Sequence, residues 1–523
     1  MFAAIRAAAA VAAFAIAGPA TAQTLSMAMS AAPTSIDPHY HTFSPNQTVN
    51  AHMFDTLVGQ DEFSRLEPGL ALSWKLLDDT TWEFKLRPGV RFHNGEALTA
   101  EDVVSSFARV PKVANSPGSY TIYTKPVVGT EIVDSHTIRL KTAGIYPLLP
   151  VDMSQVFIIP RSLGTDLASE DFNSGKLAIG TGAYRMTAYR PGDRVELERN
   201  DQFWGEKPHW QRVIIRLIPN DGARTAALLS GDVQFMEFVP TADAARLRSD
   251  KRVALAETNS LRFVYLWLDR SREGPTPFIT GPNGETLAKN PLNDLRVRQA
   301  LSIGINRPAI VERVMENAAL ATGQFLAPGS FTYVPDLPPP TYDVARAKAL
   351  LAEAGFPNGF RMTLHGPNDR YVNDGKIIQA IGQMWTRIGV QTQVDAITWP
   401  NFIARANRQE FSAFLLAWGI SSGEGSNPLR ALVHTYSPAK GWGAVNRGRY
   451  SNPTLDGLVD QAMKIGDDTA RERVLIQAQR LALDDVAVIP LHIQRNIWAM
   501  KAGLTYKARA DEGSLAMDVR PTP

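Results

Sequence analysis

Alternating strand and helix signals over residues 343–418 constrain the fold of this chain more than any other feature. Asp343 precedes an apolar helical pattern that stops at Gly355, and a second apolar stripe with helical spacing stops at Gly389. The pattern predicts, in order, helix 344–354, strand 361–364, helix 377–388, strand 390–397, helix 401–409 and strand 412–418. A β-α-β-α-β succession of this kind is typical of a doubly wound half-domain in the α/β class.

Two earlier segments carry further signals. Residues 213–238 read as strand, short helix and strand, and a helical connection implies that the two strands are parallel with a right-handed crossover. Nearer the N-terminus, residues 81–86 alternate in polarity as a strand does. Thr99 and Asp102 then form a capping-box pattern, which predicts the start of a helix.

Length and composition limit the number of units and the class of partner. The 523 residues correspond to about three folding units, and the Pro-, Gly- and Asn-rich stretch 275–291 marks a boundary or a long loop. The 54 Lys and Arg against 52 Asp and Glu give a net charge of +2, without the basic block of a nucleic-acid-binding protein. The chain has no cysteine, which excludes disulfides, thiolate catalysis and Cys-ligated metal sites.

The first 22 residues read as a signal peptide. Arg6 precedes the apolar run 7–17, which is too short to span about 30 Å of hydrocarbon, and Ala20-Thr21-Ala22 is an A-x-A cleavage site. No later segment has 18 consecutive apolar residues. We therefore expect cleavage after Ala22, no membrane anchor and a mature protein in a Gram-negative periplasm.

Candidate binding residues follow from the predicted sheet. Ligands of open α/β sheets bind outside the carboxyl ends of the strands, which places the loops 365–371 and 419–428 at the site. Arg370 offers a planar fork for a carboxylate or phosphate, and Trp399 and Trp418 offer flat apolar contact. The alternative for each residue is an ordinary structural role, as a surface ion pair for Arg370 or as core for the two Trp.

A serine hydrolase is a second hypothesis, from a different class. Residues 419–423 match G-x-S-x-G, with Ser421 as nucleophile and Asp456, His434 and His492 downstream as partners. The Gly-rich run after Ser421 is a poor helix start, whereas that motif requires a strand-to-helix turn. The nine histidines are scattered without a metal-binding motif, so we expect no resident metal and no cofactor.

Several separate motifs resemble one protein family. They are residues 82–95, 99–103 with Ser106, 180–185, 199–204, 293–301, 305–307, 388–390, 399–400, 450–453 and 489–492. Together they span most of the chain after residue 22. In these motifs the sequence resembles the family 5 extracellular solute-binding proteins, the dipeptide-, oligopeptide- and nickel-binding components of ABC importers.

This resemblance implies a two-lobed periplasmic-binding-protein clamp of cluster-C type (type II), with an extra subdomain in lobe I. Lobe I would comprise 23–55, 184–270 and 489–523, the subdomain 56–183, and lobe II 271–488, with chain crossings near 268–277 and 485–489. The protein would be a monomer that binds a small molecule or short peptide between its lobes and presents it to an inner-membrane permease. The predicted ligand-binding residues are Arg370, Tyr371, Trp399, Trp418, Ser421, Ser422, Glu424 and Asn427.

One departure from the family pattern bears on the ligand. Peptide-binding relatives carry, three residues after the Trp that matches Trp418, an Asp that pairs with the peptide ammonium, and here that residue is Ser421. Either Glu424 supplies the missing charge from the longer loop, or the ligand presents hydroxyl groups there. We favour the second option, which admits modified peptides, opines and sugar-phosphates, and carriage of a metal chelate or haem is a further alternative.

The first prediction concerns processing. Because the A-x-A site precedes Gln23 and the chain has no cysteine to acylate, N-terminal sequencing of periplasmic protein should begin at Gln23, without an acyl chain. Protein that stays with membranes through a high-salt wash would contradict this prediction, since a nearly balanced charge leaves nothing else to hold it there.

Overall fold

The parallel half-domain predicted from the alternating pattern is present. A computed structural model describes residues 23–420 and 422–522, so the predicted signal peptide and Ser421 lie outside the described residues. Strand β15 (Phe360–Pro367) pairs in parallel with β16 (Val390–Ile397) and with β17 (Ala413–Gly419). Helices α11 (Asp374–Arg387) and α12 (Trp399–Asn407) connect them, which confirms the predicted order of elements.

The predicted strand-helix-strand unit is also present, with one difference in pairing. Strand β10 (Arg212–Leu217), α6 (Asp221–Ser230) and β11 (Phe235–Met236) follow one another as expected. The two strands are parallel, but they are not neighbours, because β1 (Thr24–Met29) lies between them and pairs in parallel with both. The pairing partner comes from a distant part of the chain, which a local pattern does not reveal.

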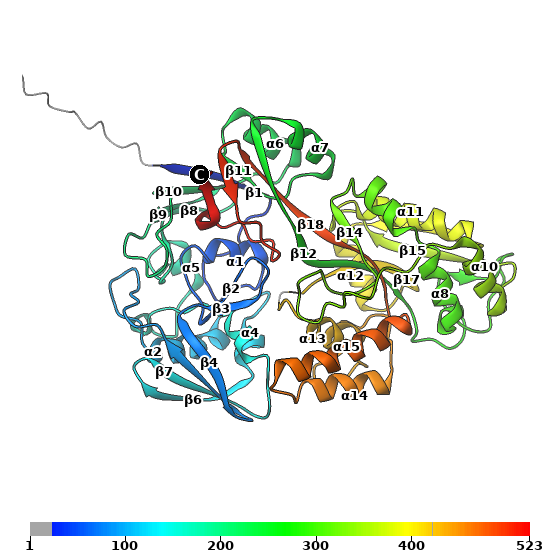
Figure 1. Ribbon diagram of the computed structural model, residues 1–523, viewed down its shortest axis with the longest axis horizontal. Helices are drawn as coiled ribbons and strands as arrows, with labels where there is room; N and C mark the ends of the chain where they lie inside the picture. Colours follow the sequence, from blue (N-terminus) through cyan, green and yellow to red (C-terminus); the bar gives the residue numbers. More distant parts are fainter. Residues whose placement is uncertain (1–22, 421, 523) are drawn as a thin grey trace, which may run out of the picture.

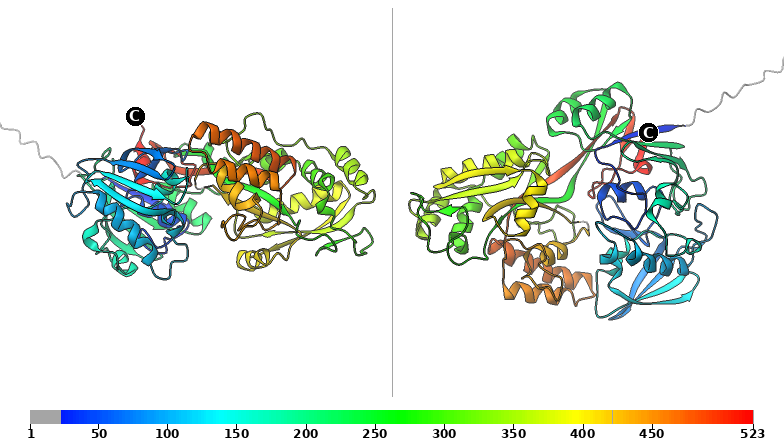
Figure 2. Two further views of the ribbon diagram at one scale, coloured as in Figure 1. Left: turned by 90° about the horizontal axis from the view of Figure 1, so that it is seen from below. Right: turned by 180° about the vertical axis from the view of Figure 1, so that it is seen from behind.

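Two long strands join the halves of the molecule. β12 (Val253–Leu268) and β18 (Ile489–Lys501) pair antiparallel within a 12-stranded sheet and run from one half into the other (Figures 1 and 2). Their register shifts between Asn259 and Phe263. On the N-terminal side of the shift, β12 pairs with residues 495–501 of β18, and β11 pairs with the same stretch of β18. On the C-terminal side, β12 pairs with β17 as well as with β18. The sheet is therefore continuous, with an irregularity where the halves meet.

The inner part of β12 is buried on both faces. Its side chains alternate between two apolar clusters, as the two-residue period of a strand requires. One cluster takes Val264, Leu266 and Leu268, and the other takes Phe263, Tyr265 and Trp267. β12 is thus the common wall between the two cores of this half.

A smaller sheet forms the separate unit at the lower left of Figure 1. Its strands, in spatial order, are β4 (Ala71–Asp78), β5 (Thr81–Leu86), β7 (Thr137–Thr142) and β6 (Val127–Asp134). Helix α2 (Ala100–Arg109) packs on it, and Asp102 Oδ2 accepts hydrogen bonds from the Thr99 amide (2.7 Å) and hydroxyl (3.0 Å). The predicted strand at 81–86 and the predicted capping box are both confirmed.

The other elements complete the large sheet, as β8 (Tyr184–Arg190), β9 (Arg194–Arg199) and β14 (Ala319–Ala321) do, or lie around the sheets. In the first half they include α1 (Ser44–Asn50), β2 (Val58–Gln60), β3 (Leu66–Pro68), α4 (Leu149–Met153), α5 (Ser169–Asn173), β8, β9 and α7 (Thr241–Ser249). In the second they include α8 (Leu295–Ile303), β14, α10 (Val344–Glu353), α14 (Pro453–Ala462) and α15 (Asp468–Asp484). No helix in 23–420 or 422–522 has the length and apolar character needed to span a bilayer.

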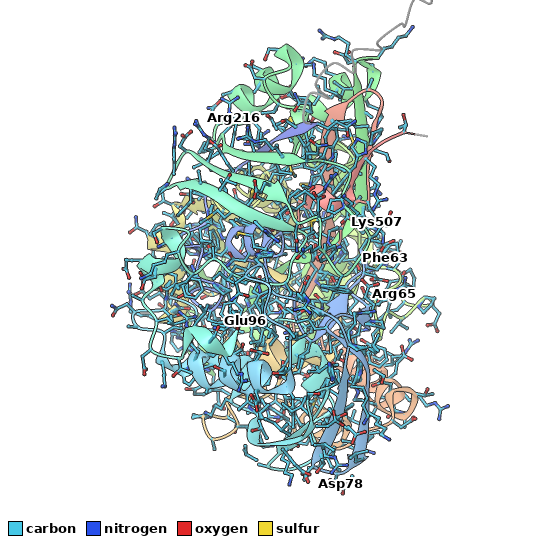
Figure 3. All side chains as sticks on the ribbon, turned by 90° about the vertical axis from the view of Figure 1, so that its left-hand side faces the viewer. Phe63, Arg65, Asp78, Glu96, Arg216 and Lys507 are labelled. Atoms are coloured by element: carbon cyan, nitrogen blue, oxygen red, sulfur yellow. The ribbon has the colours of Figure 1, made fainter. Side chains whose placement is uncertain are left out.

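The C-terminal segment returns to the first half and fastens the turn between β2 and β3. The Ala510 amide donates to the Glu62 carbonyl at 2.7 Å, and Lys507 Nζ lies 2.8 Å from Glu62 Oε2. Figure 3 shows Lys507 beside Phe63 and Arg65 at one edge of the molecule. The last residues of the chain therefore contribute to the same face as its first hundred.

The second prediction concerns acid stability and rests on His492 in β18. This side chain is 1% exposed, neither ring nitrogen has a hydrogen-bond partner among the described residues, and burial lowers its pKa to about 4. The unfolded chain binds a proton near pH 6.5 and the native chain only near 4, so stability falls as the pH drops through that window, by about 3 kcal/mol for this group.

Urea unfolding at pH 7.5 and pH 5 should therefore show a smaller acid loss in His492→Leu than in the parent. His136→Leu, at the turn between β6 and β7, is the control and should leave the acid loss unchanged. An acid loss that is the same in parent and His492→Leu would contradict the prediction.

Candidate functional site

A cleft of about 770 Å³ lies where the two halves face each other. Its walls come from the first half, from β12, from the loops after β15 and β17, and from the C-terminal segment. Four predicted ligand-binding residues line it: Arg370, Tyr371, Trp399 and Trp418. The carboxyl ends of the parallel strands thus open into the cleft, as the α/β topology requires.

The loop after β15 is held by one carboxylate. Asp374, buried in the first turn of α11, accepts hydrogen bonds at Oδ2 from the backbone amides of Arg370 (3.0 Å) and Tyr371 (2.9 Å). Asp369 Oδ1 accepts from the Trp399 amide at 2.7 Å and so ties this loop to the start of α12. The backbone beneath the site is therefore fixed before any ligand arrives.

Two aromatic rings and a guanidinium form a shelf on this loop. The Tyr371 and Trp399 rings meet edge to face with centroids 5.9 Å apart. The Arg370 guanidinium lies 5.4 Å from the Tyr371 centroid and 5.3 Å from the Trp399 centroid, within the range of cation–π attraction. Arg370 is exposed and has no ion-pair partner among the described residues, so its charge is available to a ligand.

Of the predicted residues in and beside the loop after β17, some line the cleft and others do not. Trp418 lines the cleft and donates from Nε1 to Asn427 Oδ1 at 2.7 Å, whereas Asn427 itself is not part of the lining. Ser422 is not part of the lining either, and its hydroxyl is buried without a partner among the described residues. Ser421 lies outside the described residues. Asn427 therefore orients Trp418 from behind.

Glu424 is neutralised inside the second half. Its Oε2 accepts from Arg471 Nη1 at 2.7 Å, the Ser426 hydroxyl donates to its Oε1, and both charged side chains are 5% exposed. Arg471 belongs to α15, and Glu424 does not line the cleft. In this geometry Glu424 does not replace the missing family Asp.

The C-terminal segment supplies a charge pair that the sequence patterns did not indicate. Arg262, at the register shift of β12, donates from Nε and Nη2 to the two carboxylate oxygens of Glu512 at 3.0 and 3.1 Å. The Glu512 charge raises the pKa of Arg262. Both residues of this two-bond pair line the cleft, and no local motif marks it.

Asp55 is a second cleft residue that was not predicted. Its Oδ2 accepts from Trp204 Nε1 at 2.8 Å and from the Thr181 hydroxyl at 2.7 Å, and burial raises its pKa. Thr181 and Trp204 belong to the family-like stretches 180–185 and 199–204. Those stretches could have pointed to a shared partner, but not to its identity.

The geometry around the G-x-S-x-G match lacks the context of a hydrolase. β17 ends at Gly419 and the next helix, α13 (Ser426–Pro428), begins seven residues later, so no helix follows the strand directly. His434 Nδ1 is bonded to the Thr435 carbonyl at 2.6 Å, and His492 is buried in β18. The part of the chain that the structure describes also holds no cluster of three or more His, Cys, Asp or Glu suited to a metal ion.

Comparison with known sequences gives matches along most of the chain. The model for the bacterial extracellular solute-binding proteins, family 5, matches residues 65–439. The dipeptide-binding protein of Escherichia coli is 28% identical over 454 residues, which cover 81% of this chain and 80% of that protein. Heme-binding protein A of Haemophilus influenzae is 27% identical, covering 82% and 78%. A glutathione-binding protein of Escherichia coli is 26% identical, covering 90% and 89%.

Solved structures share the fold. A protein titled HbpA2, from Haemophilus parasuis, has a TM-score of 0.81 at 23% identity and covers 96% of this chain and 100% of its own. The periplasmic murein tripeptide binding protein, in an unliganded open form, has a TM-score of 0.79 at 22% identity, covering 96% and 98%. The two-lobed α/β clamp is therefore the fold of this chain.

The third prediction follows from the Glu424–Arg471 pair. Glu424→Gln removes the buried carboxylate partner of Arg471 and leaves only the exposed Asp468, so the free energy of unfolding should fall by about 3 kcal/mol or more. Asp468→Asn is the matched control, because Asp468 bonds the same guanidinium at 2.8 Å from a side chain that is 73% exposed. Urea unfolding should show a loss of about 1 kcal/mol or less there. Equal losses in the two variants would contradict the buried-pair interpretation.

Proposed function

The chain belongs to the bacterial extracellular solute-binding proteins, family 5, and from that membership we propose that its cleft captures a polar, peptide-like solute. Proteins of this family bind a solute between two lobes and deliver it to the permease of an ABC transporter. In this proposal the protein carries out no reaction on the solute. Its work is differential binding, since a ligand shifts the lobes toward the state that holds it more tightly.

The shelf formed by Arg370, Tyr371 and Trp399 is the observation that carries the proposal. It combines flat apolar surface with an unpaired cation on a backbone that Asp374 and Asp369 already fix. Dipeptide- and glutathione-binding relatives are named for ligands that contain amides and carboxylates. Such groups suit a surface of aromatic faces, hydrogen-bond donors and a guanidinium.

The placing of the lobes is part of the proposal. The division of the chain stays a prediction. It assigns 23–55, 184–270 and 489–523 to lobe I, 56–183 to its extra subdomain and 271–488 to lobe II. That division puts the crossings near 268–277 and 485–489, whereas the register shift at Asn259–Phe263 favours crossings inside β12 and β18. Irregular pairing there would let the two halves rotate while the rest of the ladder stays intact. Periplasmic residence, cleavage after Ala22 and a monomeric state complete the proposal.

The fourth prediction tests capture and closure together. Protein purified gently from periplasm should carry a small polar solute that mass spectrometry identifies. That solute, at one hundred times its Kd, should stabilise the fold by about 2.7 kcal/mol, and small-angle scattering should show a smaller radius of gyration. A tight solute that leaves the radius unchanged would contradict the clamp, though not the binding.

A pair of aromatic variants localises the site. Trp399→Ala should weaken binding of that solute about tenfold or more, because stacking against a ring supplies on the order of 1 kcal/mol and the shelf also positions Arg370. Tyr436→Ala is the control, since Tyr436 is 47% exposed and lies outside the cleft lining. Equal affinity in the parent and Trp399→Ala would remove the shelf from the site.

A further inference from the structure

Arg447 lines the cleft, and no acidic residue of the described chain neutralises its charge. It lies in the long loop before α14, lines the cleft and is half-buried. Its Nε donates to Asn407 Oδ1 at 2.9 Å. Among the described residues, no carboxylate pairs with Arg447, and neither terminal nitrogen has a hydrogen-bond acceptor. The hydrogen bond from Nε thus fixes the guanidinium, while its two terminal nitrogens are free to bind a ligand.

Two more deeply buried arginines, Arg307 and Arg471, have their terminal nitrogens satisfied by the protein itself. Arg307 is 1% exposed and donates to the Pro490 carbonyl at 2.7 Å and to both the carbonyl and the hydroxyl of Ser302. Arg471 has two carboxylate partners. A guanidinium taken partly out of water is costly without such partners. Arg447 therefore differs from these structural arginines in what it still needs.

The charged groups around Tyr371 are mostly positive. Arg262, Arg370 and Arg447 line the cleft together with Tyr265 and Tyr371, and the Arg370 guanidinium lies 5.4 Å from the Tyr371 ring centroid. Of the three guanidiniums only Arg262 has a carboxylate, that of Glu512. This part of the cleft therefore has two positive charges that no described acidic residue neutralises. Burial lowers the pKa of Arg447, as expected for a cation that lacks a partner.

We propose that Arg447 and Arg370 together bind an oxyanion group of the solute, a carboxylate or a phosphate, on the Tyr371 side of the cleft. The inference rests on the proposed receptor function and narrows its ligands to solutes that carry an acidic group. Guanidinium forks match the planar oxygen pair of a carboxylate and the oxygens of a phosphate, and Arg447 has its terminal nitrogens free for that contact. The Tyr265 and Tyr371 hydroxyls add neutral hydrogen-bonding groups beside them.

Three probes separate the possible anions. They are the tripeptide Ala-Ala-Ala, the same tripeptide with a C-terminal amide, and inorganic phosphate, each titrated into the purified full-length protein in a thermal-shift assay. We expect the free acid or phosphate to raise the melting temperature of the parent, and the amide to bind at least tenfold more weakly than the acid. The acid and phosphate arms identify which oxyanion the site accepts.

Arg447→Gln should weaken the effective probe at least tenfold, and Arg447→Lys should restore part of the loss. Arg449→Gln is the matched control, because Arg449 lies two residues along the same loop, stacks on Tyr436 at 4.3 Å and does not line the cleft. Should Arg447→Gln fail to fold, comparing the parent with Arg447→Lys still measures how much binding depends on the two terminal N–H donors of a guanidinium. The inference is overturned if no probe affects the parent more than Arg447→Gln, or if acid and amide bind both proteins equally.

Failure of this inference and failure of the receptor function look different. A neutral solute that co-purifies and compacts the parent and Arg447→Gln alike would uphold the receptor and overturn the anion site. A probe that binds through Arg447 without any change in the radius of gyration would uphold the anion site and contradict the clamp.

Discussion

The pairing of β12 with β18 is the interaction on which the rest of the molecule depends. These two strands belong to both halves, so every other strand of the large sheet is placed, directly or through neighbours, by them. The first of their two register shifts, between Asn259 and Phe263, contains Arg262, which lines the cleft and pairs with Glu512. The same few residues therefore set the path of the chain between halves and one wall of the binding site.

Some charged residues of the cleft have an ion-pair partner within the protein, and others have none among the described residues. Glu512, Asp511 and Asp61 are each paired with an arginine. Arg370 and Arg447 have no such partner among the described residues, although their surroundings hold them in place. In the proposed anion site, such preorganised but unpaired cations cost stability in the empty protein and return it when the anion binds. Selectivity and stability are thus opposed at this site, as is usual where residues are kept for binding.

The sequence was informative wherever structure depends on local periodicity. The order β15-α11-β16-α12-β17 and the cap at Thr99 could be predicted because apolar spacing and capping act over a few residues. The insertion of β1 between β10 and β11 could not, because that pairing joins distant segments. Glu424 looked available in a Gly-rich loop, but its partner Arg471 lies 47 residues further on. Arg447 and Asp55 belong to no binding motif, and only their surroundings in three dimensions show that they face the cleft.

The return of the chain's end to its beginning has a consequence for the order of folding. The sheet of the first half needs β1 from residues 24–29 and β18 from residues 489–501, and β11 pairs with both. Contacts of such long sequence separation form slowly and late. During synthesis this half is incomplete until almost the whole chain has emerged. The sheet of this half therefore closes only when residues from both ends of the chain have come together.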